Sequence, residues 1–188
     1  MPDFPRIDKY PQFFGFYLEA SSANTDTEIR ITLPKYRFGI GATTSSVICW
    51  EFLKVELYPK IEIGHSGGCD FTVSISTASH AGRTGDDFVS DLNEGDNICF
   101  SHGYYTTPSY PYQQHFQSGT DRVCDLQFND GRGVPIATDY IFVQLQTTNY
   151  DNKFWLNGRV WYRFIKLGLS EYIGLLQQQQ VPEQEDTT

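Results

Sequence analysis

The sequence is poor in basic residues, with 14 Lys and Arg against 23 Asp and Glu in 188 residues and a formal net charge of −9. Affinity for a polyphosphate comes mainly from Lys and Arg that displace counterions, so this balance argues against a dedicated nucleic-acid-binding domain. No apolar run approaches the roughly 20 residues of a membrane-spanning helix, and prolines interrupt the N-terminal MPDFPRIDKYPQ where a signal peptide would be apolar. We therefore expect a single domain without a membrane span or a targeting signal.

The sequence also lacks the spacings that bring metal ligands or catalytic groups together. Its four cysteines, Cys49, Cys69, Cys99 and Cys124, form no CxxC pair, which argues against a tetrahedral metal site. Each adjoins an apolar or aromatic run, as expected of a small buried hydrophobe. GxSxG is absent, and the four histidines lie in or beside Gly-, Ser- and Tyr-rich connections. We therefore expect a protein that is not an enzyme and that needs no cofactor.

The acidic segment GDDFVSDLNEGDN could supply oxygen ligands to calcium. It fails the EF-hand pattern, because position twelve of a loop that begins at Asp91 is His102, where a bidentate glutamate is required. A solvated acidic loop is the favoured interpretation, and a calcium ion shared between subunits is the alternative. The carboxylates concerned are Asp86, Asp87, Asp91, Glu94 and Asp96.

Alternation of apolar and polar residues is the commonest pattern that the sequence does contain. In FTVSIST, Phe71, Val73 and Ile75 fall on one face of an extended chain, as in a half-buried strand. An aromatic content of 15%, with 16 glycines and 9 prolines, favours strands joined by turns. Eight segments follow this pattern: FFGFYLEA, TEIRITL, EFLKVEL, FTVSIST, NICFS, RVCDLQF, DYIFVQLQT and NGRVWYRFIKL.

Eight such segments without a convincing amphipathic helix of three turns predict an all-β fold, an antiparallel sandwich or barrel. Strict period-two placement predicts that the inward-facing residues of four of these strands are buried. They are Ile29, Ile31, Leu53, Val55, Val73, Ile75, Val143 and Leu145.

A long connection and the two ends of the chain fall outside this pattern. From Ser101 to Asp121 the chain is too rich in Pro and Tyr for a hairpin turn, and loops of that length are usually functional or packed as a compact lobe. We expect an N-terminal extension over residues 1–12, a domain over 13–180 and a mobile acidic tail over 181–188, where Pro182 blocks regular structure.

The C-terminal third contains DLQFNDGRGVPIATDYIFVQLQTT and then NGRVWYRFIKLGLSEYIGLLQQQQ. It resembles the end of the capsid proteins of small circular single-stranded DNA viruses. A turn like NDGRG precedes a strand like ATDYIFVQL, and a final strand with Tyr-Arg-Phe, residues 162–164, leads into Glu-Tyr-Ile-Gly, residues 171–174, before a glutamine tail. EFLKVEL, residues 51–57, is similar to a further strand of that family. The resemblance implies a single jelly roll, in which eight strands form two packed antiparallel sheets.

The resemblance also implies a structural role. Many copies of the chain would assemble through sandwich edges and loops into an icosahedral shell, the virion capsid, around a small genome. Subunit contacts are expected from the aromatic residues of the long loop and from the apolar residues near the C-terminus. The candidates are Tyr104, Tyr105, Tyr110, Tyr112, Phe116, Tyr172, Ile173 and Leu175.

The stretch WYRFIKLGLSEYIGLLQQQQ changes character in its middle. Residues 158–168 are typical of a last strand of the sandwich. The apolar SEYIGLL that follows is expected to be buried against its own domain or against a neighbouring subunit. A short helix with Ser170 as N-cap is the alternative for this segment.

Contacts with a single-stranded DNA genome are harder to place. Many viral jelly-roll proteins carry a basic N-terminal arm, whereas residues 1–12 contain only Arg6 and Lys9 against Asp3 and Asp8. Neutralisation would then fall to scattered basic residues, including two beside Tyr36 that form either a base-stacking unit or a solvated turn. The candidates are Lys35, Arg37, Lys54, Arg159 and Arg163.

A carbohydrate-binding β-sandwich is the alternative function. The Tyr-bearing segment GYYTTPSYPY offers amphipathic side chains that can stack on sugar rings. Particle size separates the two hypotheses, because a shell is large and uniform and a lectin is a monomer or a small oligomer.

Overall fold

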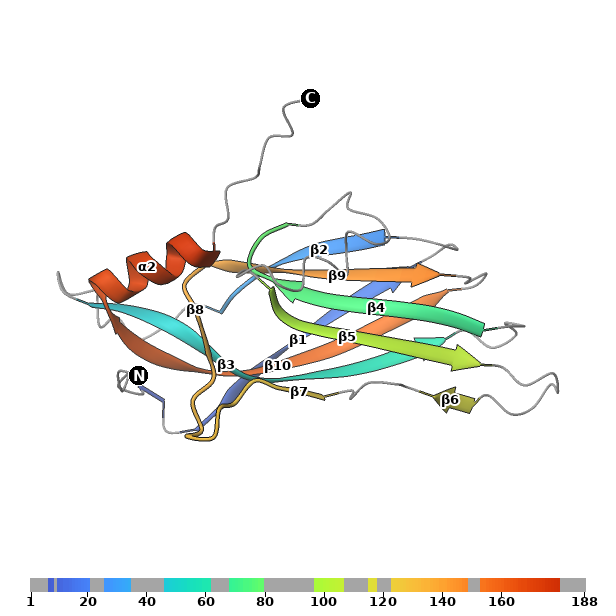
Figure 1. Cartoon of the computed structure of the whole chain (residues 1–188), viewed down its shortest axis with the longest axis horizontal. Helices are drawn as coiled ribbons and strands as arrows, with labels where there is room; N and C mark the ends of the chain where they lie inside the picture. Colours follow the sequence, from blue (N-terminus) through green and yellow to red (C-terminus); the bar gives the residue numbers. More distant parts are fainter. Residues whose placement is uncertain are drawn as a thin grey trace, which may run out of the picture.

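The described residues form a sandwich of two antiparallel sheets with the helix α2 at one end (Figure 1). The computed structural model describes residues 7–8, 10–20, 26–34, 46–61, 68–79, 97–106, 115–117, 123–148 and 153–179. The strands are β1 (Gln12–Ala20), β2 (Asp26–Thr32), β3 (Ser46–Ile61), β4 (Gly68–Ser76), β5 (Asn97–Thr106), β6 (His115–Gln117), β7 (Val123–Asp125), β8 (Val134–Ile136), β9 (Tyr140–Thr148) and β10 (Phe154–Gly168), and the helix is α2 (Leu169–Gln179).

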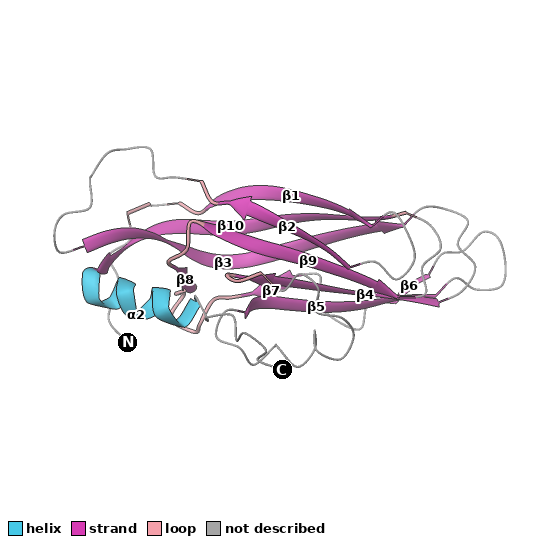
Figure 2. Ribbon diagram, turned by 90° about the horizontal axis from the view of Figure 1, so that it is seen from above, coloured by secondary structure: helices cyan, strands magenta, loops and turns pink. Residues whose placement is uncertain are grey.

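The strand order within the sheets is that of a jelly roll. One sheet has the order β1-β10-β3-β7, with β8 also paired to β3, and the other has the order β2-β9-β4-β5-β6. Along the described strands the chain changes sheet between β1 and β2, β2 and β3, β3 and β4, β6 and β7, β8 and β9, and β9 and β10, as the winding of a jelly roll requires. Figure 2 shows the two layers packed face to face. The predicted all-β jelly-roll sandwich is confirmed.

All eight predicted segments contain a strand, and the described residues add two strands of three residues each, β6 and β8. The segment from Ser101 to Asp121, predicted as one long loop, is corrected by the structure. It contains the second half of β5, through Thr106, and all of β6, which pair so that Tyr105 lies opposite Phe116. The sequence did not predict this pairing, because the many Pro and Tyr residues of the segment obscure the alternation of apolar and polar residues that indicates a strand.

The core lies between the two sheets and matches most of the predicted burial. Leu53, Val55, Val73, Ile75, Val143 and Leu145 are buried, each at most 4% exposed. Ile29 and Ile31 are only partly buried, contrary to prediction, although both pack against the core. They belong to β2, an edge strand, which has a neighbouring strand on one side only.

A β-bulge explains why β3 departs from simple alternation. Between the pairs Lys54–Trp161 and Phe52–Tyr162 the register shifts by one residue, so Leu53 has no partner on β10. Trp50 and Phe52 therefore join Val55 and the rest of the core, whereas Leu53 was predicted to share a face with Val55. The backbone carbonyl of Leu53 instead accepts a hydrogen bond from the amide of Leu126 at 3.0 Å, which fixes the start of the connection from β7 to β8.

The cysteines occupy apolar surroundings where the structure describes them. Cys49 and Cys99 are buried, Cys124 is partly buried and none of these three forms a disulfide, whereas the side chain of Cys69 lies outside the described residues. Burial raises the pKa of Cys49 to about 12. A hydrogen bond between the thiols of Cys124 and Cys99, together with burial, raises the pKa of Cys99 strongly. Cys49 and Cys99 are therefore neutral thiols at physiological pH.

Helix α2 begins earlier than the alternative prediction had it. Gly168, not Ser170, occupies the N-cap position, and its amide donates to the carboxylate of Glu171 at 2.9 Å. This is the glutamate half of a capping box. Tyr172 and Leu175 on the inner side of α2 pack against Cys49 and its apolar neighbours, so the helix is buried against its own domain.

The last residue of α2 fastens the helix to the sandwich. The side-chain amide of Gln179 donates to the carbonyl of Pro135 and accepts from the amide of Ala137, both at 2.8 Å, much as a neighbouring strand would. Its backbone carbonyl accepts from the hydroxyl of Thr77 at 2.8 Å. Gln179 is 4% exposed, and one glutamine of the QQQQ tail is thus a structural residue.

Replacing Gln179 with alanine is expected to detach α2 more often and to speed alkylation of Cys49, because both backbone groups bonded by the amide lose their partner. The measurement is the rate of modification of the Cys49 peptide, followed by mass spectrometry so that it is separated from Cys124. Gln178→Ala is the matched control, because Gln178 is exposed on the same turn. Equal rates in the two variants would contradict the role of Gln179.

Candidate interaction surface

The outward side of the sheet that contains β1, β10 and β3 is an open surface of aromatic and charged side chains. Three of its aromatic side chains are half exposed: Phe13 is 55%, Tyr17 is 51% and Tyr58 is 48% exposed. Large aromatic side chains on one exposed sheet face are unusual outside interaction sites. We call this surface the aromatic face, formed by Phe13, Tyr17 and Glu19 of β1, Trp155, Arg159 and Trp161 of β10, and Lys54, Glu56, Tyr58 and Lys60 of β3.

Alternation places these side chains on one surface. In β1 the residues between them, Phe14, Phe16 and Leu18, point into the core. Because β1, β10 and β3 are paired in register, outward residues form rows across the three strands. The rows read Phe13–Trp161–Lys54, Gly15–Arg159–Glu56, Tyr17–Asn157–Tyr58 and Glu19–Trp155–Lys60.

Cations lie over the rings of this surface. The ammonium of Lys54 lies 5.2 Å from the Trp161 ring centre, and that of Lys60 lies 5.6 Å from the Trp155 ring centre. The guanidinium of Arg159 lies 4.7 Å from the ring centre of Phe13. Such contacts contribute about 0.5–1 kcal/mol each at exposed sites, and they hold the long side chains in fixed positions.

Glu56 neutralises the centre of the aromatic face. Its carboxylate lies 2.6 Å from the ammonium of Lys54 and 3.7 Å from the guanidinium of Arg159, and it accepts from the hydroxyl of Tyr58 at 3.0 Å. The contact with the Lys54 ammonium, together with the hydrogen bond from the Tyr58 hydroxyl, lowers the pKa of Glu56 to about 2. The carboxylate is therefore ionised at physiological pH.

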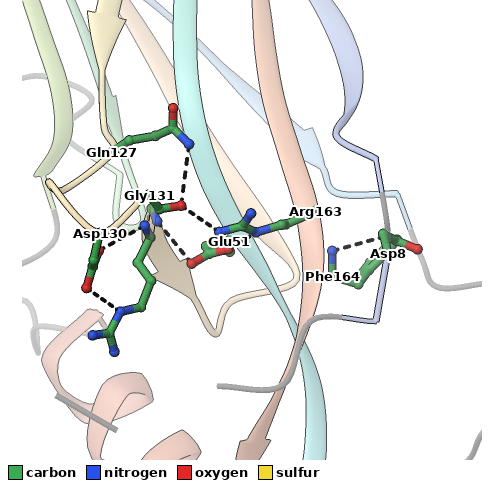
Figure 3. A network of polar contacts seen from close by, with 9 residues as sticks. Asp8, Glu51, Gln127, Asp130, Gly131, Arg163 and Phe164 are labelled. Atoms are coloured by element: carbon green, nitrogen blue, oxygen red, sulfur yellow. Dashed lines mark hydrogen bonds and ion pairs between the residues drawn. The ribbon is translucent and has the colours of Figure 1, made fainter. Parts of the chain in front are cut away.

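A buried ion pair lies beyond the bulge, on the same side of the sheet (Figure 3). The Nε of Arg163 donates to the carboxylate of Glu51, which also accepts from the amide of Gly133 at 3.0 Å. A second guanidinium nitrogen of Arg163 donates to the carbonyl of Gly131 at 2.8 Å. The pair thus holds the β7–β8 connection against the sheet.

The turn held by this pair is the NDGRG motif of the sequence. The amide of Gly131 donates to the carbonyl of Phe128 at 2.8 Å, and that of Phe128 donates to the carbonyl of Arg132 at 2.7 Å. Gly131 has φ of +74°, which favours glycine because it has no side chain to clash. Figure 3 also shows Asp8, whose carboxylate accepts from the amide of Phe164 at 3.1 Å, so part of the predicted N-terminal extension contacts β10.

The structure brings some of the predicted site residues together and separates others. Lys54 and Arg159 lie close together on the aromatic face, whereas Arg163 is 8% exposed and is held by Glu51. Arg163 therefore has an internal structural role and does not line this surface. Lys35 and Arg37 lie outside the described residues.

The predicted subunit contacts are likewise divided. Ile173 is 46% exposed on the outer side of α2, whereas Tyr172 and Leu175 face the protein's own core. Tyr104 and Tyr105 lie on β5 and Phe116 lies on β6. Tyr110, Tyr112 and the acidic residues within 86–96 fall outside the described residues.

Sequence reasoning did not identify the aromatic face. The sequence shows its outward residues as alternate residues of three strands. It does not show that these three strands are neighbours in one sheet. The described residues contain no group of three or more His, Cys, Asp or Glu side chains placed to hold a metal ion. Within the same residues, no helix has the length and apolar character needed to cross a membrane.

No protein-family model matches the chain, and no curated protein sequence matches it. Among solved structures, the chain is similar to the VP1 pentamer of Washington University polyomavirus, with 9% identity, a TM-score of 0.50, and coverage of 89% of this chain and 98% of that chain. VP1 of Trichodysplasia spinulosa-associated polyomavirus, in complex with GM1 oligosaccharide, matches with 10% identity, 89% and 97% coverage and a TM-score of 0.49. The likeness to VP1 of Washington University polyomavirus concerns the fold alone, which is a jelly roll.

Proposed function

We propose that this protein is a capsid subunit, many copies of which assemble into an icosahedral shell, the virion capsid, around a small single-stranded DNA genome. The observation that carries the proposal is the jelly-roll strand order of the described residues, together with a structural match that covers 98% of a polyomavirus VP1 chain. The resemblance of the C-terminal third to capsid proteins of small circular single-stranded DNA viruses supports the genome type. Its active parts are interfaces, and no catalytic centre is part of this proposal.

Electron microscopy of the purified protein tests this function. We expect uniform shells, because a capsid subunit carries on its own surface the contacts that close an icosahedral assembly. Sedimentation of the same sample gives the particle mass. A protein that stays monomeric or forms only small oligomers under all assembly conditions would contradict the proposal.

The segment from Ser101 to Asp121 is proposed to supply subunit contacts through its aromatic residues. Replacing residues 107–114 with a short Gly-Ser linker is expected to prevent shell formation and to leave a folded monomer, because the change lies between β5 and β6 and spares both. Circular dichroism checks the fold and microscopy checks assembly. If this variant forms normal shells, the replaced residues are not needed for subunit contacts and the segment has another role.

Genome contacts are proposed to be few, because the chain has a net charge of −9 and the predicted contact residues Lys54 and Arg159 already pair with Glu56. Because each phosphate contact adds about −0.7 to the log-log salt slope for single strands, we expect weak binding of single-stranded DNA with a shallow slope. Titration of labelled DNA at several salt concentrations measures the slope, and nuclease-treated protein is expected to assemble normally. A steep slope, or assembly that strictly requires DNA, would show a basic surface elsewhere in the chain.

A carbohydrate-binding module is the second candidate. The half-exposed rings of Phe13, Tyr17 and Tyr58 favour it, since flat aromatic surfaces can stack on sugar rings. Glycan binding by a protein that remains monomeric would favour this candidate over the capsid function.

A further inference from the structure

The aromatic face carries charges in an order that complements itself. Glu19 and Lys60 stand at the two ends of one row, with Trp155 between them. Likewise, Phe13 and Lys54 stand at the ends of the row that contains Trp161, and Tyr17 and Tyr58 at the ends of the row that contains Asn157. Each of these three rows therefore joins two groups that attract each other or stack, and β10 supplies the residue between them.

A two-fold axis that runs along β10, just above this surface, would bring the two ends of each row opposite each other in two copies of the chain. Such an axis places a second copy face to face with the first, keeps the order of the rows and exchanges β1 with β3. Glu19 then lies opposite Lys60 of the second copy, Phe13 opposite Lys54, and Tyr17 opposite Tyr58. Because the contact is two-fold, every such pair forms twice. An axis perpendicular to the strands and centred between the second and third rows would instead reverse the rows and place β1 over β1, which brings no acidic residue opposite a lysine.

The remaining row, Gly15–Arg159–Glu56, suits the same arrangement. Glu56 would face Gly15 of the second copy, and a residue without a side chain leaves room for the carboxylate and its partners. Nothing but the carbonyl of Gly158, at 3.6 Å, would lie near a side-chain carbon at Gly15. Arg159 lies near the axis, where two like charges would meet, but its guanidinium is 3.7 Å from Glu56 of its own chain, which offsets the repulsion.

The residue types are those that stabilise protein interfaces. Trp, Tyr and Arg are enriched among the residues that contribute most to binding, and they act best in rigid, desolvated positions. Here the cation–ring contacts and the bonds of Glu56 already fix their positions, so little side-chain freedom remains to be lost on association. Two sheets that stack face to face lie about 30° apart because of their twist, so the axis would be inclined to β10 by about half that angle, an offset that the long side chains of Lys60 and Glu19 can span.

We propose that the aromatic face is a two-fold contact between copies of this chain, with β1 of each copy against β3 of the other. The inference rests on the proposed self-assembly and names one of its interfaces. The contact is built of four rows in three strands, so it is expected to be modest in a free dimer and to gain strength from the other contacts of a shell.

The test is a pair of charge reversals, Lys60→Glu and Glu19→Lys, examined alone and mixed. In a homodimer of either variant, like charges meet twice, and we expect the dimer Kd to rise about tenfold or more. In an equimolar mixture, opposite charges would meet at both contacts. The carboxylate introduced at position 60 of one copy then faces the ammonium introduced at position 19 of the other, and the unaltered Glu19 faces the unaltered Lys60. A heterodimer should therefore form with nearly the original Kd, and sedimentation velocity over a range of concentrations gives each Kd.

Lys166→Glu is the matched control, because it makes the same charge change at an exposed position of β10 outside the aromatic face. We expect it to leave the Kd unchanged, and urea unfolding of each variant checks that the fold is intact. The proposal is overturned if the unaltered protein does not dimerise, if the two reversals have no more effect than Lys166→Glu, or if mixing fails to restore association.

Microscopy of the same samples separates this proposal from the capsid function. Shells that form equally well from either charge-reversal variant would overturn the two-fold contact and leave the capsid function intact. Dimers that respond as expected to mixing, in a protein that forms no shells, would support the contact and contradict the capsid function.

Discussion

Replacing Arg163 with methionine is expected to lower the free energy of unfolding by about 3–5 kcal/mol, the usual cost of removing one partner of a buried ion pair. The side chain of Glu51 is 3% exposed, so its carboxylate would lose its counter-ion without gaining access to water. The amide of Gly133 would remain as its donor, and a single amide does not offset the desolvation of a charge. Urea unfolding, followed by tryptophan fluorescence, gives the change in free energy.

Two further variants separate the charge effect from its surroundings. Arg132→Met removes a guanidinium from the same turn, where Arg132 and Asp130 pair at 2.6 Å, but Asp130 is 45% exposed. We expect a cost of no more than about 1 kcal/mol there. The double variant Glu51→Leu with Arg163→Met should recover part of the loss, since no buried charge is left alone. Equal costs for Arg132→Met and Arg163→Met would contradict a buried ion pair.

Replacing Gly158 with alanine is expected to destabilise the fold by about 1–3 kcal/mol, as is typical of overpacking a core. Gly158 lies opposite Phe16 in the pairing of β1 with β10, and the Phe16 ring covers it. A side-chain carbon at this position would lie 1.9 Å from the end of that ring, so the ring would have to leave its place in the core. Because Gly158 has no side chain, it leaves the space in which the Phe16 ring of the edge strand β1 packs into the core.

Gly15→Ala is the matched control for this prediction. Gly15 lies in the same strand pair but faces outward, where ordinary van der Waals space is available, so its replacement should cost little. A double-mutant cycle tests whether the Phe16 ring is the cause. In a Phe16→Leu background, Gly158→Ala should lower the free energy of unfolding by less than in the unaltered chain, because the smaller side chain leaves room. Equal costs in both backgrounds would show that Phe16 is not the obstacle.

Much of the fold could be predicted because strand formation is encoded locally. Each of the eight alternating segments became a strand, since a period of two places one apolar set on one face whatever the partner strand is. The errors occur where a neighbour decides the outcome. Ile29 and Ile31 alternate as strictly as Val73 and Ile75, but β2 is an edge strand and β4 is not.

The residues of the candidate site divide in the same way. The sequence identified Lys54, Arg159 and Arg163 only as basic residues of strands. The bulge at Leu53 shifts the phase of β3 by one residue, and the β7–β8 turn covers Glu51 and Arg163 while leaving Lys54 and Arg159 open. Arg163 therefore forms a buried ion pair with Glu51, whereas Lys54 and Arg159, on the same two strands, belong to an exposed surface.

By itself, the sequence determined the class of fold, the positions of its long strands and the two-sided character of each strand, because these follow from local periodicity and turn residues. Only the tertiary structure decided which strands are neighbours, and with them the rows of the aromatic face. Glu19, Lys60 and Trp155 lie far apart along the chain, yet they form one row across β1, β3 and β10. The physical reason is that strand pairing joins distant segments through backbone hydrogen bonds that are the same for every residue, so the register is set by the packing of the whole sandwich.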